Sequence, residues 1–168
     1  MIRSRILFLS ILSFFLSCKG VKKDKPVTIV PDNTLEKVKL TDLKSNSISL
    51  NHYAGKTIFL NFWATWCKPC ITEMPTIEKA QNILKKEGVV FLMASNEAKE
   101  EIDAFGKAHN FNFNYCQILN SEELGIEGLP TTFIFNQEGK LVFSELGYRK
   151  WDEKSNIDMI LKIINKNE

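Results

Sequence analysis

Two cysteines separated by two residues stand out among the residues that could do chemistry. Cys67 and Cys70 lie in the stretch N-F-W-A-T-W-C-K-P-C at 61–70, directly behind a run of apolar and aromatic residues. A C-x-x-C pair can bind a metal, form a structural disulfide or exchange electrons as a dithiol–disulfide couple. The chemistry of the chain depends on which of these three uses applies.

A metal site and a structural disulfide both fit the sequence less well than a redox couple does. A structural zinc site needs about four ligands. The remaining candidates are Cys116, His52 and His109, with no second C-x-x-C or H-x-x-x-H spacing. A disulfide that closes so short a loop restricts the unfolded chain very little. The sequence therefore favours a redox couple, with no metal and no cofactor other than the two cysteines.

Cys67 and Cys70 are expected to have different roles because a helix begins beside them. The apolar strand predicted at 57–63 leads to a helix that starts near Cys67. Unpaired backbone N–H groups and the positive end of the helix dipole stabilise a thiolate there, which makes Cys67 a competent nucleophile. Cys67 would attack a substrate disulfide, and Cys70, one turn deeper, would resolve the mixed disulfide.

The two residues between the cysteines are expected to tune the couple. Pro69 offers no N–H and has the φ angle of a helix start, which favours a rigid turn. Lys68 places a positive charge beside the nucleophile, which favours its thiolate and makes the couple more oxidising. The alternative for Lys68 is a solvated surface lysine with negligible effect, because exposed charges are well screened.

The elements that must position the pair follow from the hydrophobic periodicity. Strands are predicted at 57–63, 89–94, 113–118, 129–136 and 140–146, helices at 67–88, 97–110, 121–125 and 152–165, and an N-terminal β-hairpin from 38–40 and 47–50. The alternation of strands and helices predicts parallel strands with crossover helices, and the last hairpin adds an antiparallel edge. The fold class is therefore α/β: a central mixed β-sheet flanked by helices on both faces, with an N-terminal β-hairpin extension.

Residues 1–17 are interpreted as an export signal. Arg3 and Arg5 precede an apolar run at 6–16, which is shorter than the roughly 17–25 residues needed to span a bilayer. Removing the signal leaves 20 basic residues (22 minus the two arginines) against 20 acidic ones. A chain without net charge argues against a nucleic-acid partner, which needs a concentrated basic surface.

The end of the apolar run resembles a bacterial lipoprotein signal, in which the cysteine becomes the lipidated N-terminus. That cysteine would be Cys18, although Phe15 stands where such signals usually have leucine. The segment 18–28 would then be a lipid-anchored flexible tether, followed by one folded domain at 29–168. The alternatives are an ordinary cleaved signal, or an uncleaved anchor with an incidental cysteine.

The motifs around the cysteine pair resemble a known family. The stretch N-F-W-A-T-W-C-K-P-C-I-T-E-M-P, followed some sixty residues after Cys70 by G-L-P-T-T-F-I-F, is similar to the TlpA/ResA/CcmG-like thiol–disulfide oxidoreductases of bacterial cell envelopes. The resemblance covers roughly 30–166 and implies a thioredoxin-like fold. It also implies that Pro130 is a cis proline opposite the disulfide, which excludes metal and leaves the backbone of Leu129 free to pair with a substrate. The residues alone fit a trans proline at the start of an edge strand equally well.

The resemblance also bears on proton transfer. In the ResA-like branch, an acid at the position of Glu73 is implicated in proton handling at the active site. The alternative is a surface glutamate in a first helical turn, where the helix dipole favours it. Ordinary thioredoxin has a buried aspartate where this chain has Asn61. Since an amide cannot take a proton, the transfer falls to Glu73 or to a water.

The remaining aromatic and cysteine side chains have simpler expected roles. Trp63 and Phe62 are expected in the core. Trp66, directly before Cys67, is expected from the resemblance to shield the disulfide and to contact substrate. Cys116 is predicted to be a buried free thiol that acts as a small hydrophobic residue.

Together these features predict a monomeric thiol–disulfide oxidoreductase of the cell envelope, tethered to the membrane through its lipid anchor. The resemblance implies a reductant of exported protein disulfides. It suggests apocytochrome c as a substrate, in cytochrome c maturation, and a membrane-embedded thiol protein as the electron donor. A disulfide-donating oxidase would use the same residues.

Two other protein classes with related folds fit less well. Copper chaperones of this fold typically use C-x-x-x-C with a distant histidine, whereas only two residues separate the cysteines here. A peroxidase would need a Thr or Pro shortly before its cysteine and a nearby arginine, and Arg149 is the only arginine after the signal.

Overall fold

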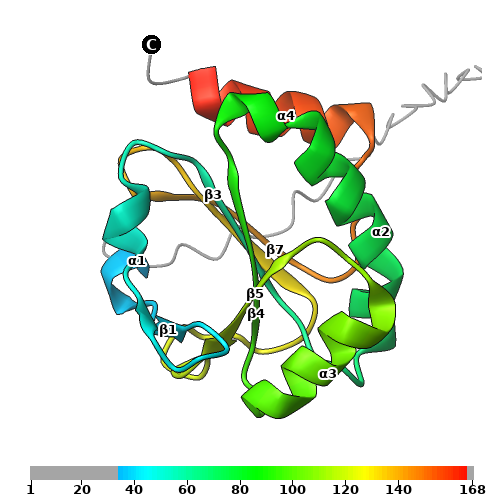
Figure 1. Cartoon of the computed structure of the whole chain (residues 1–168). Helices are drawn as coiled ribbons and strands as arrows, with labels where there is room; N and C mark the ends of the chain where they lie inside the picture. The colour runs from blue at the N-terminus through cyan, green and yellow to red at the C-terminus, as the bar shows by residue number, and fades with distance from the viewer. Residues whose placement is uncertain (1–33, 166–168) are drawn as a thin grey trace, which may run out of the picture.

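A seven-stranded mixed β-sheet runs through residues 34–165, the part of the chain that the computed structural model describes (Figure 1). In chain order the strands are β1 (Leu40–Thr41), β2 (Ser47–Ile48), β3 (Ile58–Phe62), β4 (Val90–Ser95), β5 (Asn114–Ile118), β6 (Thr131–Phe135) and β7 (Leu141–Leu146). In space they lie in the order β2-β1-β5-β4-β3-β6-β7. The predicted signal at 1–17, with Cys18, and the tether at 18–28 lie outside the described residues and stay predictions.

Strand β3, which leads to the cysteine pair, lies inside the sheet. It pairs in parallel with β4 and antiparallel with β6, and β4 pairs in parallel with β5. All five residues of β3 and all five of β6 are buried. Such continuous apolar strands are expected where a sheet is covered on both faces. The predicted mixed sheet is therefore confirmed, with β7 as its antiparallel edge.

The predicted N-terminal hairpin is also confirmed, and it forms the opposite edge of the sheet. Leu40 pairs with Ile48 across β1 and β2, and β1 pairs antiparallel with β5. The turn of this hairpin is stabilised by Asp42, whose carboxylate accepts the backbone N–H groups of Lys44 and Asn46, both at 2.8 Å. Asp side chains favour turns because they make such local bonds.

Helices cover the two faces of the sheet unequally (Figure 1). The helical segments are α1 (Thr34–Lys37), η1 (Leu50–Tyr53), α2 (Lys68–Ile83), η2 (Lys85–Glu87), α3 (Lys99–His109) and α4 (Lys154–Asn165). The long helices α2, α3 and α4 pack on one face, around Phe59, Met74 and Ile160. The short α1 and η1 cover the other face together with the connection 119–130.

The helix predicted at 121–125 is wrong, because this segment forms turns. Its bonds are short-range turn bonds, from the N–H of Leu124 to the carbonyl of Ser121 and from the N–H of Gly125 to the carbonyl of Glu122. Gly125 then has a φ of 67°, which leaves the helical region. Five residues are too few to nucleate a helix without strong tertiary support.

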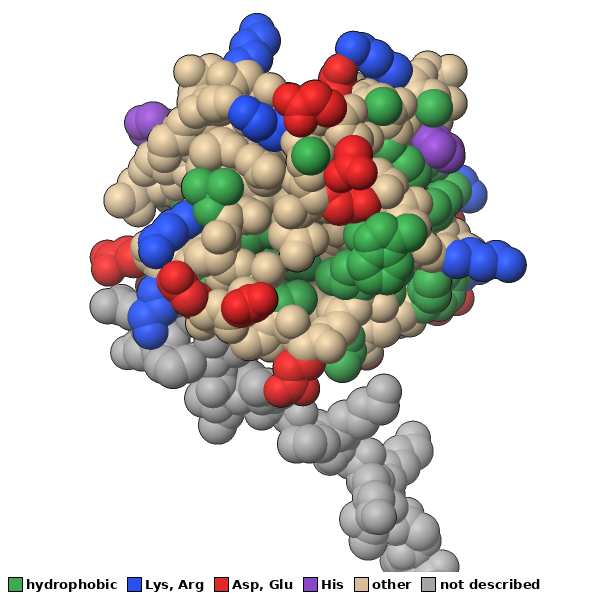
Figure 2. Space-filling view, turned by 90° about the horizontal axis from the view of Figure 1, so that it is seen from below, with side chains coloured by type: hydrophobic (Ala, Val, Ile, Leu, Met, Phe, Trp, Pro, Cys, Tyr) green, Lys and Arg blue, Asp and Glu red, His purple; other side chains and the backbone are tan. Residues whose placement is uncertain are grey.

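The surface viewed from below carries hydrophobic side chains gathered among acidic ones (Figure 2). Large side chains that remain exposed include Trp66, Leu146 and Tyr148. No helix among residues 34–165 is both long enough and apolar enough to cross a bilayer.

Candidate active site

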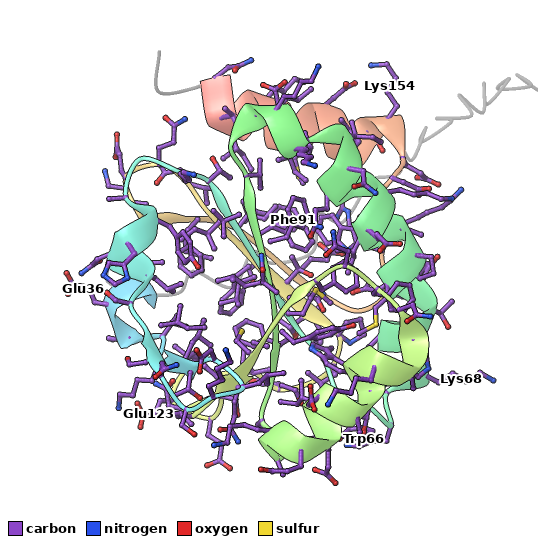
Figure 3. All side chains as sticks on the ribbon, viewed as in Figure 1. Glu36, Trp66, Lys68, Phe91, Glu123 and Lys154 are labelled. Atoms are coloured by element: carbon purple, nitrogen blue, oxygen red, sulfur yellow. A yellow bond between two sulfur atoms is a disulfide. The ribbon has the colours of Figure 1, made fainter. Side chains whose placement is uncertain are left out.

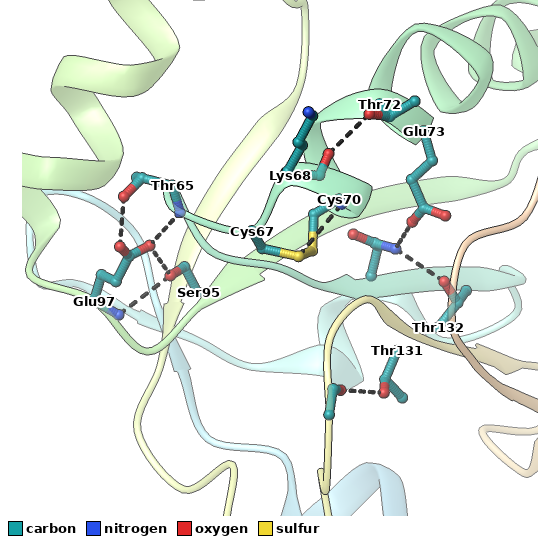
Figure 4. The surroundings of a disulfide bond; sticks show 12 residues. Thr65, Cys67, Lys68, Cys70, Thr72, Glu73, Ser95, Glu97, Thr131 and Thr132 are labelled. Atoms are coloured by element: carbon teal, nitrogen blue, oxygen red, sulfur yellow. Dashed lines mark hydrogen bonds between the residues drawn. A yellow bond between two sulfur atoms is a disulfide. The ribbon is translucent and has the colours of Figure 1, made fainter.

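The two cysteines lie at the start of α2, just after the loop that connects it to β3, and a disulfide joins them (Figure 4). Cys67 is the N-cap of α2, and its sulfur accepts a hydrogen bond from the backbone N–H of Cys70 at 3.3 Å. This bond comes from one of the first N–H groups of the helix, which lack partners within the helix. The geometry therefore provides the helix N-terminus on which the expected thiolate at Cys67 depends.

The disulfide is almost covered, whereas the residues beside it are exposed. Cys67 is 4% exposed and Cys70 is 1% exposed. Lys68 and Pro69 between them are exposed, and Lys68 and Trp66 both point to the surface near the start of α2 (Figure 3). Trp66 is 73% exposed, so most of its indole is free to contact another molecule. The roles expected for these side chains stay predictions.

Glu97 holds the loop that precedes Cys67, and the sequence reasoning missed it. Its carboxylate accepts hydrogen bonds from the backbone N–H of Thr65 at 2.7 Å, from the Thr65 hydroxyl at 2.6 Å and from the Ser95 hydroxyl at 2.8 Å (Figure 4). The carboxylate thus ties the loop between β3 and α2 to the end of β4. The only signal for this role was an acid at the start of the helix predicted at 97–110, shortly after a predicted buried strand.

Glu73 is buried beside the disulfide rather than exposed in the first turn of the helix. Its side chain is 1% exposed, so the surface-glutamate alternative is wrong. One carboxylate oxygen accepts the Asn61 amide at 2.8 Å, and the other accepts the backbone N–H of Arg149 at 3.0 Å. Burial raises the pKa of Glu73 to about 7, while the N–H of Arg149 and the amide of Asn61 partly lower it.

Asn61 connects three elements of the fold. It is fully buried on β3, and its amide nitrogen donates to Glu73 on α2 and to the hydroxyl of Thr132 on β6, the latter at 2.9 Å (Figure 4). The amide oxygen of Asn61 has no hydrogen-bond partner among the described residues. The Asn61 amide therefore orients the carboxyl of Glu73, the residue three positions after Cys70.

The Leu129–Pro130 peptide bond is cis, as the resemblance implied, and the trans alternative is wrong. The carbonyl of Pro130 accepts the N–H of Gly147 at 2.8 Å. Within residues 34–165, neither the N–H nor the C=O of Leu129 has a hydrogen-bond partner. These free groups could pair with an extended peptide, as the resemblance predicts.

Trp66 and Leu129 both line a pocket of about 250 Å³. Its walls are mixed: Ile118 and Ile126 are among the apolar side chains, and Asn96, Ser121 and Glu127 are polar. This pocket joins two of the residues that were expected to contact substrate.

Other cysteine and histidine side chains lie apart from this chemistry. Cys116 is fully buried as predicted, and burial raises the pKa of its thiol to about 12, which makes it unreactive. His109 is exposed and its ring stacks on Phe105 at 3.9 Å between centroids. Residues 34–165 contain no group of three or more His, Cys, Asp or Glu side chains that could hold a metal ion.

Comparison with known proteins gives a family and several relatives. The Redoxin family matches residues 26–161. A protein from Geobacillus kaustophilus named thiol-disulfide oxidoreductase ResA is 40% identical over 108 residues, which are 61% of this chain and 61% of that relative. The match therefore spans about three fifths of the length of this curated relative.

Solved structures share the fold. A solution structure of a thiol:disulfide interchange protein from a Bacteroides species is 27% identical with a TM-score of 0.65, and covers 76% of this chain and 86% of that chain. A crystal structure from Chlorobium tepidum has a TM-score of 0.68 at 24% identity, over 80% of this chain and 94% of that chain. The second comparison supports the thioredoxin-like fold alone.

Proposed function

The chain belongs to the Redoxin family, and on that premise we propose that it is a thiol–disulfide oxidoreductase. The observation that carries this proposal is the Cys67–Cys70 disulfide at the N-terminus of α2, with the free backbone of Leu129 nearby. The relative named thiol-disulfide oxidoreductase ResA supports the same activity.

The proposed reaction moves two electrons from the reduced cysteine pair to a protein disulfide. The Cys67 thiolate attacks one sulfur of the substrate disulfide, and the other substrate sulfur leaves as a thiolate. Cys70 then loses its proton and attacks the sulfur of Cys67, which breaks the mixed disulfide. The substrate leaves with two reduced sulfurs: one thiolate takes the Cys70 proton and the other takes a proton from water. The Cys67–Cys70 disulfide forms in the same step.

Glu73 is the proposed acceptor for the proton that Cys70 loses. Its carboxyl is buried three residues after Cys70, and it has a pKa of about 7. A base with a pKa near the working pH combines a useful ionised fraction with enough basicity to take a proton. Glu73 would afterwards return the proton to the leaving thiolate, so that protons balance over the cycle.

The direction of electron flow is proposed to be reductive. An exported protein works where disulfides form readily, so a dedicated reductant has substrates there. Apocytochrome c in cytochrome c maturation is the substrate that we favour, with a membrane thiol protein as the source of electrons. A reduction potential near the oxidising end, at about −120 mV, would instead identify an oxidase that donates disulfides.

The proposed location is the cell envelope, with Cys18 lipidated and the domain on the extracytoplasmic side. The basic start and short apolar run at 1–17 support this proposal. Mass spectrometry of the N-terminal peptide from membranes should find lipid on Cys18. An unmodified Cys18, or recovery of the whole protein in the soluble fraction, would contradict lipid anchoring.

Trapping tests the proposed function and identifies the substrate in one experiment. A Cys70→Ser variant should hold its substrate as a mixed disulfide on Cys67, because the resolving thiol is missing. Mass spectrometry of the trapped partner separates apocytochrome c from other exported proteins. A Cys67→Ser, Cys70→Ser double variant is the matched control. Equal capture by both variants would contradict the catalytic role of Cys67.

A further inference from the structure

A short segment between β7 and α4 touches α2 beside the cysteine pair. Residues 149–151 make two hydrogen bonds with side chains of α2. The N–H of Arg149 donates to the carboxylate of Glu73 at 3.0 Å, and the N–H of Trp151 donates to the hydroxyl of Thr76 at 3.1 Å. The position of this backbone therefore decides whether Glu73 receives its second hydrogen bond.

The side chain of Arg149 is fixed on several sides. Its Nε donates to Asn156 Oδ1 at 2.8 Å, and its NH1 lies 3.3 Å from the carboxylate of Glu145. Its guanidinium also lies over the ring of Phe143 at 5.2 Å and over the ring of Trp151 at 5.5 Å. A planar guanidinium is suited to such stacking combined with directed hydrogen bonds.

Asn156 links this side chain to the backbone of the same segment. It is 4% exposed on α4, and its amide nitrogen donates to the carbonyl of Lys150 at 2.8 Å. One buried amide thus binds both the guanidinium of Arg149 and the next carbonyl along the chain. The side chain and the backbone at 149–150 are held by the same residue, so loosening one should loosen the other.

We propose that Arg149 is a positioning residue for Glu73. The side chain of Arg149 fixes the backbone at 149–151, so that the backbone N–H of Arg149 donates a hydrogen bond to the buried carboxylate of Glu73. This inference rests on the proposed function, in which Glu73 accepts the proton of Cys70. The guanidinium contacts Glu145 and Asn156, whereas Glu73 is met by the main chain. Arg149 therefore acts on Glu73 through geometry rather than through its charge.

Several other groups surround the carboxyl of Glu73. The groups that face Glu73 or its hydrogen-bond partners come from each packed element: the Cys67–Cys70 disulfide on α2, Asn61 on β3, Thr132 on β6, Trp151 in the segment, and Glu145 on β7 through Arg149. Losing the Arg149 N–H would remove one of the bonds that favour the charged carboxylate. The titration of Glu73 should then move to higher pH.

The test is the titration of Glu73 in the oxidised protein, followed by the NMR signal of its side-chain carboxyl carbon. Arg149→Ala and Arg149→Lys should both raise the titration midpoint by about one pH unit. Arg149→Lys is decisive because it keeps the charge but loses the stacked, forked geometry. Lys150→Ala is the matched control, since it removes a neighbouring exposed cation and should leave the midpoint unchanged.

Each result supports or overturns the inference. If the Glu73 midpoint in Arg149→Lys equals that of the wild type, the positive charge alone affects Glu73. If the midpoint in Arg149→Ala equals that of the wild type, the side chain of Arg149 has no effect on Glu73. Either result overturns the inference. If Arg149→Ala does not fold, Asn156→Ser loosens the same segment with Arg149 intact and should raise the midpoint in the same way. An unchanged midpoint in that variant would also overturn the inference.

The titration is measured without turnover, so it separates this inference from the proposed function. The second measurement is the rate of substrate disulfide reduction as a function of pH. The part of this rate profile that depends on the ionisation of Glu73 should shift by the same amount as the titration midpoint of Glu73. A shifted midpoint with an unshifted rate profile would support the positioning role and contradict proton transfer by Glu73. Normal wild-type reduction with no shift in any variant would contradict the positioning role alone.

Discussion

Glu73 illustrates how a single carboxyl acquires useful chemistry from its surroundings. Burial at 1% exposure raises its pKa, and hydrogen bonds from Asn61 and Arg149 keep it able to ionise. Its position three residues after Cys70 could be predicted from the sequence, because that spacing is local. Its partner Arg149 could not, because the two residues are 76 positions apart and meet only in the fold.

Replacing the carboxyl of Glu73 should slow the reaction without changing its cysteines. Glu73→Gln keeps the size and the hydrogen-bonding oxygen but cannot accept a proton. We expect the rate of substrate disulfide reduction to fall by at least about tenfold at pH 7, within the range usual for general acid–base groups. Stopped-flow kinetics with a protein disulfide would measure this. A rate within twofold of wild type would contradict proton transfer by Glu73.

The same carboxyl should make stability depend on pH. The pKa of Glu73 is raised from 4.5 to about 7 on folding, so the folded state binds the proton more tightly. The resulting stabilisation is fully present below pH 4.5 and is lost as the pH rises through 7, by ~3 kcal/mol in all. Urea unfolding of the oxidised protein between pH 4.5 and 8 should show this loss in wild type, whereas Glu73→Gln should lack it.

The control for this stability prediction is Glu87→Gln, which changes an exposed carboxyl in η2. Its unfolding free energy should follow the wild-type pH dependence. Parallel curves for wild type and Glu73→Gln would mean that Glu73 titrates alike in the folded and unfolded states.

At the scale of elements, the site depends on how β3, the following loop and α2 are joined. The order of these elements could be predicted, because an apolar strand, a C-x-x-C and a helical pattern follow one another locally. The contact between the loop and β4 could not, since Glu97 and Thr65 are 32 residues apart. The turn at 121–125 was mistaken for a helix because composition alone does not show where Gly125 takes a positive φ.

Removing the Glu97 carboxylate should destabilise the loop that presents Cys67. Glu97→Ala leaves the backbone N–H and the hydroxyl of Thr65 without their acceptor, which should cost about 1–3 kcal/mol. Thermal unfolding should show the lower stability, and the second-order rate of substrate reduction should fall with it. Glu100→Ala, in the first turn of α3, is the control and should leave both quantities near wild type. Wild-type values for Glu97→Ala would contradict a role in holding the loop.

At the scale of the whole molecule, the family and the fold could be predicted from two motifs that lie far apart in the sequence. The C-x-x-C region and the Pro130 region come together because β3 and β6 are neighbours in the sheet. Their meeting leaves Trp66, the pocket and the free backbone of Leu129 on one surface. Apocytochrome c was suggested by the family resemblance alone, because the choice of substrate depends on surface complementarity with another chain.

Truncating Trp66 should weaken substrate binding more than chemistry. An exposed aromatic side chain beside a pocket is typical of an anchoring residue at an interface. For Trp66→Ala we expect a KM about tenfold higher with a nearly unchanged kcat. Ile83→Ala is the control, because Ile83 is also exposed but lies at the far end of α2. An unchanged KM for Trp66→Ala would contradict substrate contact by this indole.

Counting disulfides on both proteins tests whether Cys67 and Cys70 together transfer two electrons to a protein disulfide. The fully reduced protein is mixed with a disulfide-containing protein, and both are alkylated and weighed by mass spectrometry over time. We expect one substrate disulfide to open for each Cys67–Cys70 disulfide that forms, and none to open with Cys67→Ser. Substrate reduction at the wild-type rate by Cys67→Ser, or no reduction by the wild-type protein, would contradict electron transfer through this pair.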